Sequence, residues 1–223
     1  MTMKVKDVMG SVAITVPLDA PFVELVDTMR RFDVGAVTVI DFDRRPVGVV
    51  TADDVLLKEI HPEAKAGALF ESRRRRGEQR KAAGTTAQQL MTSPAITVTE
   101  GTSVREAARL MHARHIKQLP VINVMTGRVT GTVHQKDLLK VFTRPAGDIE
   151  RDVRQMIEQA NVTGDGLDVA VDAGVVTLTG RTALRSEAAH LARSAETVDG
   201  VVGVIADLTF IQDDQAFVPP VYL

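Results

Sequence analysis

Two similar heptapeptides, Gly48–Asp54 and Gly131–Asp137, contain the side chains with the clearest capacity for chemistry. Each follows a short apolar run and precedes a helix-like run, so each is expected to form a strand, a turn and a helix N-terminus that carries an acid. Such an N-terminus offers unpaired N–H groups and a partial positive charge to phosphate. A carboxylate there can accept two hydrogen bonds from a ribose diol, and the Thr51 hydroxyl can serve phosphate or ribose. In the alternative interpretation, Thr51 starts the helix and the acid complements the helix dipole.

The two heptapeptides belong to a larger repeat. Residues 7–9, 13–16 and 39–40 match residues 89–91, 95–98 and 121–122 at an offset of 82. The offset becomes 83 at Gly48 and Asp54, which places one insertion in the loop near Thr126 and Gly127. Two copies of one structural unit are therefore expected. An acid in the same register of both copies favours a binding role over a chance helix start.

Composition and charge exclude several classes of protein. The 223 residues include 27 Lys and Arg against 29 Asp and Glu, so no overall field favours nucleic acid or an acidic membrane. The absence of cysteine removes disulfides, thiol nucleophiles and sulfur-ligated zinc. Residues 1–8 lack the apolar core of a signal peptide, and no apolar stretch approaches the roughly 20 residues that span a bilayer. We therefore expect a cytoplasmic protein.

Periodicity within each copy predicts the order β-α-β-β-α. In the first copy, apolar residues at helical spacing follow Pro21, and a β-rich run over 34–40 leads through a turn at 43–46 to a strand over 47–50. In the second copy, Ser103 and Glu106 form a capping box before the helix. Its strands are expected over 119–124 and 129–133.

A third unit follows the break at residues 145–147. It combines an amphipathic helix over 149–160 with two strands joined by the turn Asp172-Ala173-Gly174. A second helix over 184–198 and a final alternating strand over 202–210 complete it. A small α-β-β-α-β module is therefore expected.

The repeat resembles a tandem pair of CBS domains, the Bateman module known from AMP-activated protein kinase and IMP dehydrogenase. The resemblance covers roughly residues 4–143 and rests on the two heptapeptides together with Asp7-Val8-Met9, Leu90-Met91-Thr92 and Gln118–Ile122. The family heptapeptide is Gly-apolar-x-Ser/Thr-x-Ser/Thr-Asp. The first copy matches at Thr51 and Asp54 but has Asp53 in place of the second hydroxyl. The second matches at Asp137, whereas His134 and Lys136 replace both hydroxyls.

Such modules typically bind adenine nucleotides in the clefts between their repeats and associate into dimers through their helices. The resemblance therefore implies AMP, ADP or ATP as a regulatory ligand, no obligatory cofactor, and a homodimer. It assigns the ribose to Asp54 and Asp137, with Thr51 also at the sugar-phosphate. These roles give an energy-sensing, regulatory module.

The phosphate-facing positions of the two copies differ. The family often places basic residues before the second central strand, where Lys117 and Gln118 stand in the second copy and Gly35 and Ala36 in the first. A cleft that combined Thr51 and Asp54 of the first copy with Lys117 would have a hydroxyl, an acid and a base for the nucleotide. The other cleft would have only Asp137 and His134 of the second copy. In the alternative interpretation, Lys117 is a solvated surface lysine and the histidine only starts a helix. The predicted nucleotide contacts are Thr51, Asp54, Lys117, Gln118, His134 and Asp137.

A basic arm separates the copies. Residues 62–87 are too long for a routine connection and include Arg73–Arg76. Such an arm could grip nucleic acid, an acidic lipid surface or nucleotide phosphates, or form a solvated linker helix. Four arginines without nearby aromatics or a binding fold are a weak nucleic-acid signal, so we do not expect that partner.

The third unit resembles a BON domain through Gly174–Gly180 and Val198–Val204. That family is associated with phospholipid or membrane-surface interaction, chiefly in bacterial envelope proteins. The resemblance implies a phospholipid or protein partner for this unit, and it supplies no reactive group.

No arrangement typical of an enzyme or a metal site is present in the sequence. No catalytic Ser/His/Asp order, Walker loop or metal-ligand cluster is found, and His112 and His115 are interpreted as surface residues. We expect a non-enzymatic sensor with no catalytic residues and no metal ligands. Its clefts bind an adenine nucleotide and its BON domain is the output. One alternative is a scaffold with vacant clefts that is tethered through the BON domain. Another is a nucleic-acid-linked regulator that uses Arg73–Arg76.

The expected fold class is α+β (α/β), with two packed CBS repeats and a small BON domain. The predicted boundaries are 1–61 and 88–144 for the CBS repeats, 62–87 for the arm, 147–212 for the BON domain and 213–223 for a C-terminal tail.

Overall fold

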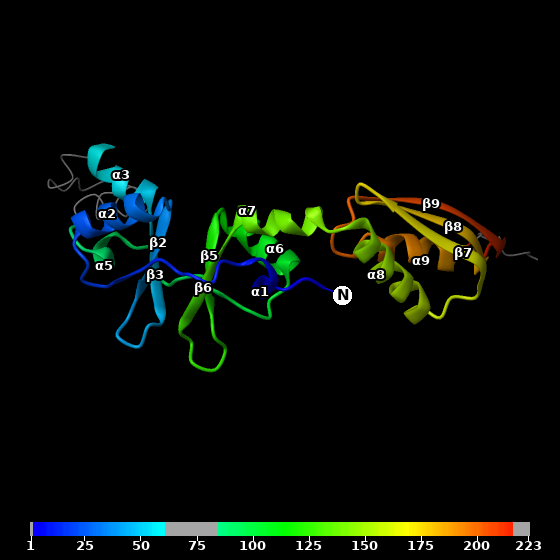
Figure 1. Cartoon of the computed structure of the whole chain (residues 1–223), viewed down its shortest axis with the longest axis horizontal. Coiled ribbons are helices and arrows are strands. Elements are labelled where there is room, and N and C mark those ends of the chain that lie inside the picture. The colour runs from blue at the N-terminus through cyan, green and yellow to red at the C-terminus, as the bar shows by residue number, and fades with distance from the viewer. Residues whose placement is uncertain (1, 61–83, 216–223) are drawn as a thin grey trace, which may run out of the picture. The chain divides into compact units, whose positions relative to one another are not determined.

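The computed structural model describes residues 2–60 and 84–215 (Figure 1). It divides into two compact units, Lys4–Leu138 and a second that joins Met1–Met3 to Leu139–Leu223. Three mixed three-stranded sheets with their helices confirm the α+β class. The Arg73–Arg76 arm and residues 216–223 of the predicted tail lie outside the described residues.

The first copy of the repeat has the predicted order of elements. Its sheet has the order β1-β2-β3, with β1 parallel to β2 and β2 antiparallel to β3. Leu25 and Met29, one helical turn apart, bring the apolar face of the first helix onto Val37 and Val39. The elements are β1 (Thr15–Pro17), α2 (Phe22–Phe32), β2 (Ala36–Ile40), β3 (Pro46–Thr51) and α3 (Ala52–Ile60).

The second copy repeats this arrangement, with sheet order β4-β5-β6. The predicted helix start is confirmed, because the Ser103 hydroxyl accepts a hydrogen bond from the Glu106 N–H at 3.1 Å. Register pairs Val121 with Gly131, as Val39 pairs with Gly48 in the first copy. The elements are β4 (Val98–Thr99), α6 (Val104–Arg114), β5 (Gln118–Ile122), β6 (Val129–His134) and α7 (Gln135–Leu138).

The helical turn that opens each copy packs against the other copy. Turn α1 (Val5–Val8) donates hydrogen bonds from its first two N–H groups to the carbonyls of Thr102 and Glu100 in the second copy. Turn α5 (Ala87–Leu90) bonds in the same way to the carbonyls of Ala20 and Leu18 in the first copy, and its two end residues are part of that copy's core. The two copies therefore exchange equivalent segments, an arrangement that the repeat alone did not predict.

Two strand glycines make this exchange possible. A Cβ at Gly131 would lie 2.4 Å from the carbonyl oxygen of Gly10, which follows α1. A Cβ at Gly48 would lie 2.4 Å from the Sδ of Met91, which follows α5. Because real Cβ atoms do not approach other atoms this closely, any larger residue at either position would force the neighbouring atoms to move.

The second unit has the predicted α-β-β-α-β order. Helices α8 and α9 cover one face of a sheet with order β7-β8-β9. The predicted turn joins the first two strands, and Ala173 and Gly174 both have positive φ (46° and 79°). A 3₁₀ helix, η1 (Leu139–Thr143), precedes these elements, which are α8 (Ala146–Gln159), β7 (Gly164–Asp172), β8 (Val175–Leu184), α9 (Arg185–Ala195) and β9 (Gly203–Gln212).

The last strand is only partly covered. Val204 and Leu208 pack on the core, as the alternating pattern predicts, but Val202 and Phe210 are exposed. Strand β9 lies at one edge of its sheet and pairs on one side only with β8. The alternating sequence pattern predicts which residues lie on the same face of the strand. How much of that face is buried depends on the helices that pack against it.

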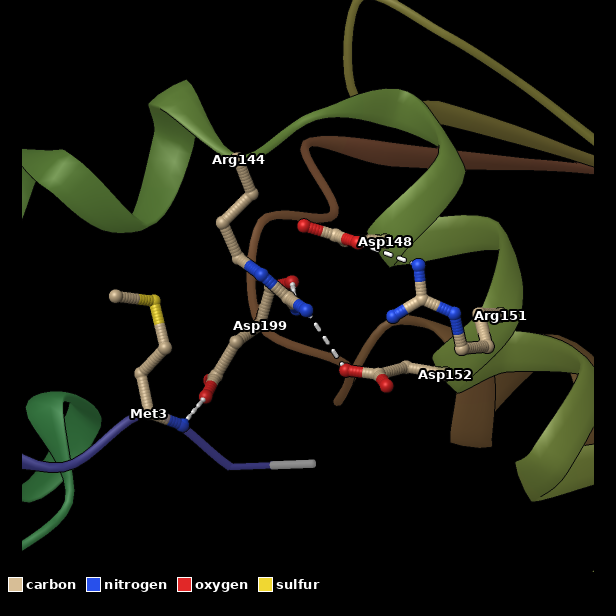
Figure 2. Close-up of polar contacts among 6 residues, drawn as sticks. All are labelled: Met3, Arg144, Asp148, Arg151, Asp152 and Asp199. Carbon is tan, nitrogen blue, oxygen red and sulfur yellow. Dashed lines mark hydrogen bonds and ion pairs between the residues drawn. The ribbon is translucent and has the colours of Figure 1, made fainter. Parts of the chain in front are cut away.

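A largely buried charged cluster in the second unit links Met3, the segment before α8, α8 itself and the loop after α9 (Figure 2). The Arg144 guanidinium donates to the Asp152 carboxylate at 2.8 Å and to the Asp199 carbonyl at 2.6 Å. The Asp199 carboxylate accepts the Met3 N–H, which ties the first residues of the chain to this unit. Burial by itself raises the pKa of Asp152, but hydrogen bonds and positive charge, including those of Arg144, outweigh it and hold the pKa below its usual value.

We expect Gly131→Ala to lower the free energy of unfolding by about 1–3 kcal/mol, because the new methyl group must displace the backbone at Gly10. Gly48→Ala should cost less, because it meets the flexible side chain of Met91. Gly35→Ala is the matched control, since a Cβ there meets no described atom within 4 Å. Urea unfolding measures all three, and equal stability of the Gly131 and Gly35 variants would contradict the close approach.

Arg144→Ala should lower stability by about 1.5–3 kcal/mol, the value of a hydrogen bond to a charged group. Arg151→Ala is the control. Arg151 forms an exposed ion pair with Asp148 on α8, the helix that also carries Asp152 (Figure 2), and this pair should contribute about 0–1 kcal/mol. Because the pKa of Asp152 is lowered on folding, its contribution is present above the unfolded value of 3.8 and is lost as the pH falls through the folded value. Asp152→Asn should therefore flatten the acid limb of stability against pH. Equal losses for the two arginine variants in thermal unfolding would refute the assignment.

Candidate functional site

The first heptapeptide forms a strand-to-helix junction closed by its own polar side chains. Strand β3 ends at Thr51 and α3 begins at the next residue. The Asp54 carboxylate accepts hydrogen bonds from the Thr51 N–H at 2.9 Å and the Thr51 hydroxyl at 2.8 Å. The same hydroxyl accepts the Asp54 N–H at 3.2 Å, which completes a reciprocal cap. Asp54 is buried (8% exposed), so this junction is rigidly held.

The second heptapeptide builds the same junction with other side chains. The Asp137 carboxylate accepts the His134 N–H at 2.9 Å, as Asp54 accepts that of Thr51. Strand pairing places Gln118 opposite His134, and the Lys117 carbonyl accepts the Gln135 N–H at 2.9 Å. The structure thus brings four of the predicted contacts together at one end of β5 and β6, from Lys117 and Gln118 to His134 and Asp137.

Gly35 and Ala36 of the first copy are structurally equivalent to Lys117 and Gln118 of the second. The Gly35 carbonyl accepts the Ala52 N–H at 2.9 Å, and Ala36 pairs with Thr51 across the sheet. Gly35 and Ala36 therefore occupy the places that Lys117 and Gln118 occupy in the second copy. The first copy supplies a hydroxyl and an acid without a base, and the second supplies an acid, a base and a histidine.

The electrostatics of His134 follow from its partial burial. Burial lowers the pKa of its imidazole below 6.5, the nearby Asp137 carboxylate raises it, and Lys136 lowers it further. The net shift is downward, so the neutral ring persists to lower pH than in a solvated histidine. A bound phosphate would oppose this shift by favouring the imidazolium.

Sequence reasoning missed one polar group in the first copy. Thr38 is 1% exposed, and its hydroxyl has no hydrogen-bond partner in the part of the chain that the structure describes. Its neighbours Val37 and Val39 belong to the core cluster, so the alternation of the strand turns Thr38 to the other face of the sheet. The sequence did contain a signal for this group, because Thr38 is the only polar residue in the strand Ala36–Ile40.

Among the described residues, no group of three or more His, Cys, Asp and Glu side chains is arranged to hold a metal ion. Within residues 2–60 and 84–215, no helix is both long enough and apolar enough to cross a bilayer. The polar groups at the two junctions can form hydrogen bonds to a sugar and pair with the charge of a phosphate.

Comparison with known families agrees with this geometry. The CBS domain model matches residues 5–60 and 87–144, and the BON domain model matches residues 145–212. The chain belongs to the CBS-domain family. Its CBS domains form a tandem pair, and a BON domain follows them, as the resemblance predicted. CBS-domain modules are generally regulatory.

Similar proteins include an uncharacterized protein, MK0525 of Methanopyrus kandleri, which is 26% identical over 137 residues, or 61% of each chain. Inosine-5'-monophosphate dehydrogenase of Aquifex aeolicus is 27% identical over 192 residues, which are 84% of this chain and 34% of the enzyme. The match with this chain therefore covers about three fifths of the length of the first relative and a third of the length of the second.

Two solved structures show the CBS-pair fold. CBSX2 in complex with AMP has a TM-score of 0.53 at 22% identity, over 61% of this chain and 94% of that one. The CBS domain pair of protein MJ0100, in complex with 5'-methylthioadenosine and S-adenosyl-L-methionine, has a TM-score of 0.51 at 20% identity, over 64% and 98%.

Asp54→Ala should lower the free energy of unfolding by about 0.5–2 kcal/mol, the usual cost of losing a helix cap. Asp53→Ala is the matched control, because Asp53 is exposed in the same helical turn and removes the same charge. Denaturant unfolding of both variants separates capping from charge. If the two variants were equally stable, the bonds between Thr51 and Asp54 would contribute nothing measurable.

Proposed function

We propose that this CBS protein is a non-enzymatic, cytoplasmic regulator that binds an adenine nucleotide, AMP, ADP or ATP, between its two repeats. The observation that carries the proposal is the pair of equivalent strand-to-helix junctions, each with an acid fixed at a helix N-terminus. The solved CBS pairs named above, whose bound molecules contain adenosine, add support.

The proposed contacts divide between sugar and phosphate. Asp54 and Asp137 accept ribose hydroxyls, because a carboxylate can accept from both hydroxyls of a diol. Thr51 contacts the sugar-phosphate, and Lys117 supplies positive charge to the phosphates. Gln118 and His134 complete the second copy's set. A cleft that combines the acid and hydroxyl of the first copy with Lys117 would bind one nucleotide more tightly than the other cleft.

Regulation would follow from a shift between conformations of the CBS pair. A nucleotide that bridges both copies favours one mutual arrangement, to the extent that it binds that arrangement more tightly. The helices of the CBS repeats would also form the homodimer contact, so ligand binding and association would be linked. No obligatory cofactor takes part.

The BON domain is the proposed output, and its charge favours a protein partner over an anionic phospholipid. Residues 139–223 include seven Lys and Arg against thirteen Asp and Glu, a net charge of −6. An anionic lipid surface attracts basic segments and repels such a unit. The face of its sheet that the helices leave uncovered also includes exposed Asp207, which suits a partner with positive charge.

The test is a thermal-unfolding screen of the full chain against AMP, ADP, ATP and S-adenosyl-L-methionine. A ligand that binds only the folded state, at about 100 times its dissociation constant, adds about 2.7 kcal/mol of stability. We expect at least one adenine nucleotide to raise the melting temperature, and Asp54→Ala or Asp137→Ala to weaken binding by about 1.5–3 kcal/mol relative to Asp53→Ala. No shift with any adenine ligand at millimolar concentration would favour a scaffold with vacant clefts.

Calorimetric titration at two pH values tests the asymmetry of the clefts. Because the pKa of His134 lies below 6.5 in the free protein, we expect the weaker site to gain affinity as the pH falls below 6.5, where phosphate stabilises the imidazolium. His134→Gln should remove that dependence and leave the tighter site unchanged. Two equivalent sites that are indifferent to pH would show that the substitutions in the second copy do not affect binding.

A further inference from the structure

The tips of two hairpins in the CBS unit expose large apolar side chains. The first tip, residues 41–45, joins β2 to β3, and the second, residues 123–128, joins β5 to β6. Phe42 is fully exposed (105%), and Met125 and Val124 are exposed to 90% and 72%. Phe42 and Val124 are equivalent in the repeat at the offset of 82, which holds up to the insertion near Thr126. Met125 lies next to Val124, so both copies place apolar side chains at the apex.

The two tips are held side by side. The Arg44 carbonyl accepts the Val129 N–H at 3.1 Å, and the Arg45 guanidinium donates through Nε to the Thr126 carbonyl at 3.3 Å. Figure 1 shows both hairpins extending to the same side of the CBS unit, beyond the ends of their sheets. The exposed apolar residues therefore form one paired apex rather than scattered surface positions.

Each tip is shaped by its own polar side chain, independently of the apolar residue beside it. The Asp41 carboxylate accepts the N–H groups of Asp43 and Arg45, at 3.0 and 2.8 Å. The Asn123 side-chain oxygen accepts the N–H groups of Met125 and Thr126, both at 3.0 Å. These bonds fix the turns, so the apolar side chains are not needed to fold them.

We propose that this paired apex inserts into the interface of an anionic phospholipid bilayer. Three exposed arginines, Arg44, Arg45 and Arg128, flank the apolar residues. Arginine places its apolar stem against apolar surroundings and keeps its charge in water, where it can pair with lipid phosphates. Apolar side chains at an apex with arginines beside them match the order of acyl chains and headgroups in a lipid interface.

Charge and shape argue against the other occupants of this apex. In a two-fold contact with a second copy, the three arginines of one apex would approach the same three of the other, with only Asp41 and Asp43 to offset them. An apex projects, so a protein partner would need a matching pocket, whereas a fluid lipid surface adapts to a projecting side chain. Because only two turns insert, the association should be weak, reversible and sensitive to salt.

The test is sedimentation of the full chain with vesicles of phosphatidylcholine, with or without about 30% phosphatidylserine, which mimics an anionic leaflet. Arg73–Arg76 are changed to glutamine in a parallel set, so that this basic run cannot supply the attraction. The variants are Phe42→Ser with Met125→Ser, and Arg44→Asn with Arg128→Gln. Leu56→Ser is the control, because Leu56 is also exposed (54%) but lies in α3, which follows the end of β3 away from the tip.

We expect the full chain to bind phosphatidylserine vesicles in both sets and to bind phosphatidylcholine less. Each pair of apex substitutions should lower partitioning about tenfold or more, with the melting temperature unchanged, and Leu56→Ser should have no effect. Equal sedimentation of the Phe42/Met125 variant and its parent would overturn the proposal. So would apex-dependent self-association in sedimentation velocity, or apex-dependent binding of polyglutamate without vesicle binding, which would indicate a second copy or an acidic protein instead.

Discussion

The CBS unit depends on the reciprocal exchange of its two short helical turns. Neither copy completes its packing with its own leading segment, because α1 bonds to the second copy and α5 enters the core of the first. The exchange brings backbone and Met side chains onto β6 and β3 so closely that only hydrogen fits at Gly131 and Gly48. The constraint that holds the copies together thus acts on the same strands that deliver the candidate ligand residues.

The two junctions share a backbone and differ in chemistry. Each acid is fixed by the N–H of the residue that ends the strand, so its position is set before any ligand arrives. What varies is the side chain at the strand end, a hydroxyl in Thr51 and an imidazole in His134, and the presence of a base at Lys117. Binding to a preorganised site loses little free energy to ordering, which suits the reversible response of the proposed sensor.

Much of the fold was predictable because its signals are local. Periodicity, the capping box at Ser103 and the turn before Val175 each depend on neighbouring residues, and the repeat aligned Gly35 with Lys117 correctly. The exchange was not predictable, because a repeat shows which residues are equivalent but not which copy each contacts. The burial that lowers the pKa of His134, and the contact of Arg144 with a carbonyl 55 residues away, depend equally on tertiary packing.

The exchanged turns also constrain how this protein folds during its synthesis. The first copy cannot close its core until Ala87 and Leu90 have been synthesised, well after its own sheet and helices are complete. Turn α1 precedes the second copy in the sequence, so its hydrogen-bond acceptors at Glu100 and Thr102 are synthesised only later. Domains usually fold one after another during synthesis, but these two copies must finish together. A chain truncated between the copies would expose the apolar surface that α5 covers, so the pair, and not the single repeat, is the smallest unit that can satisfy its own core.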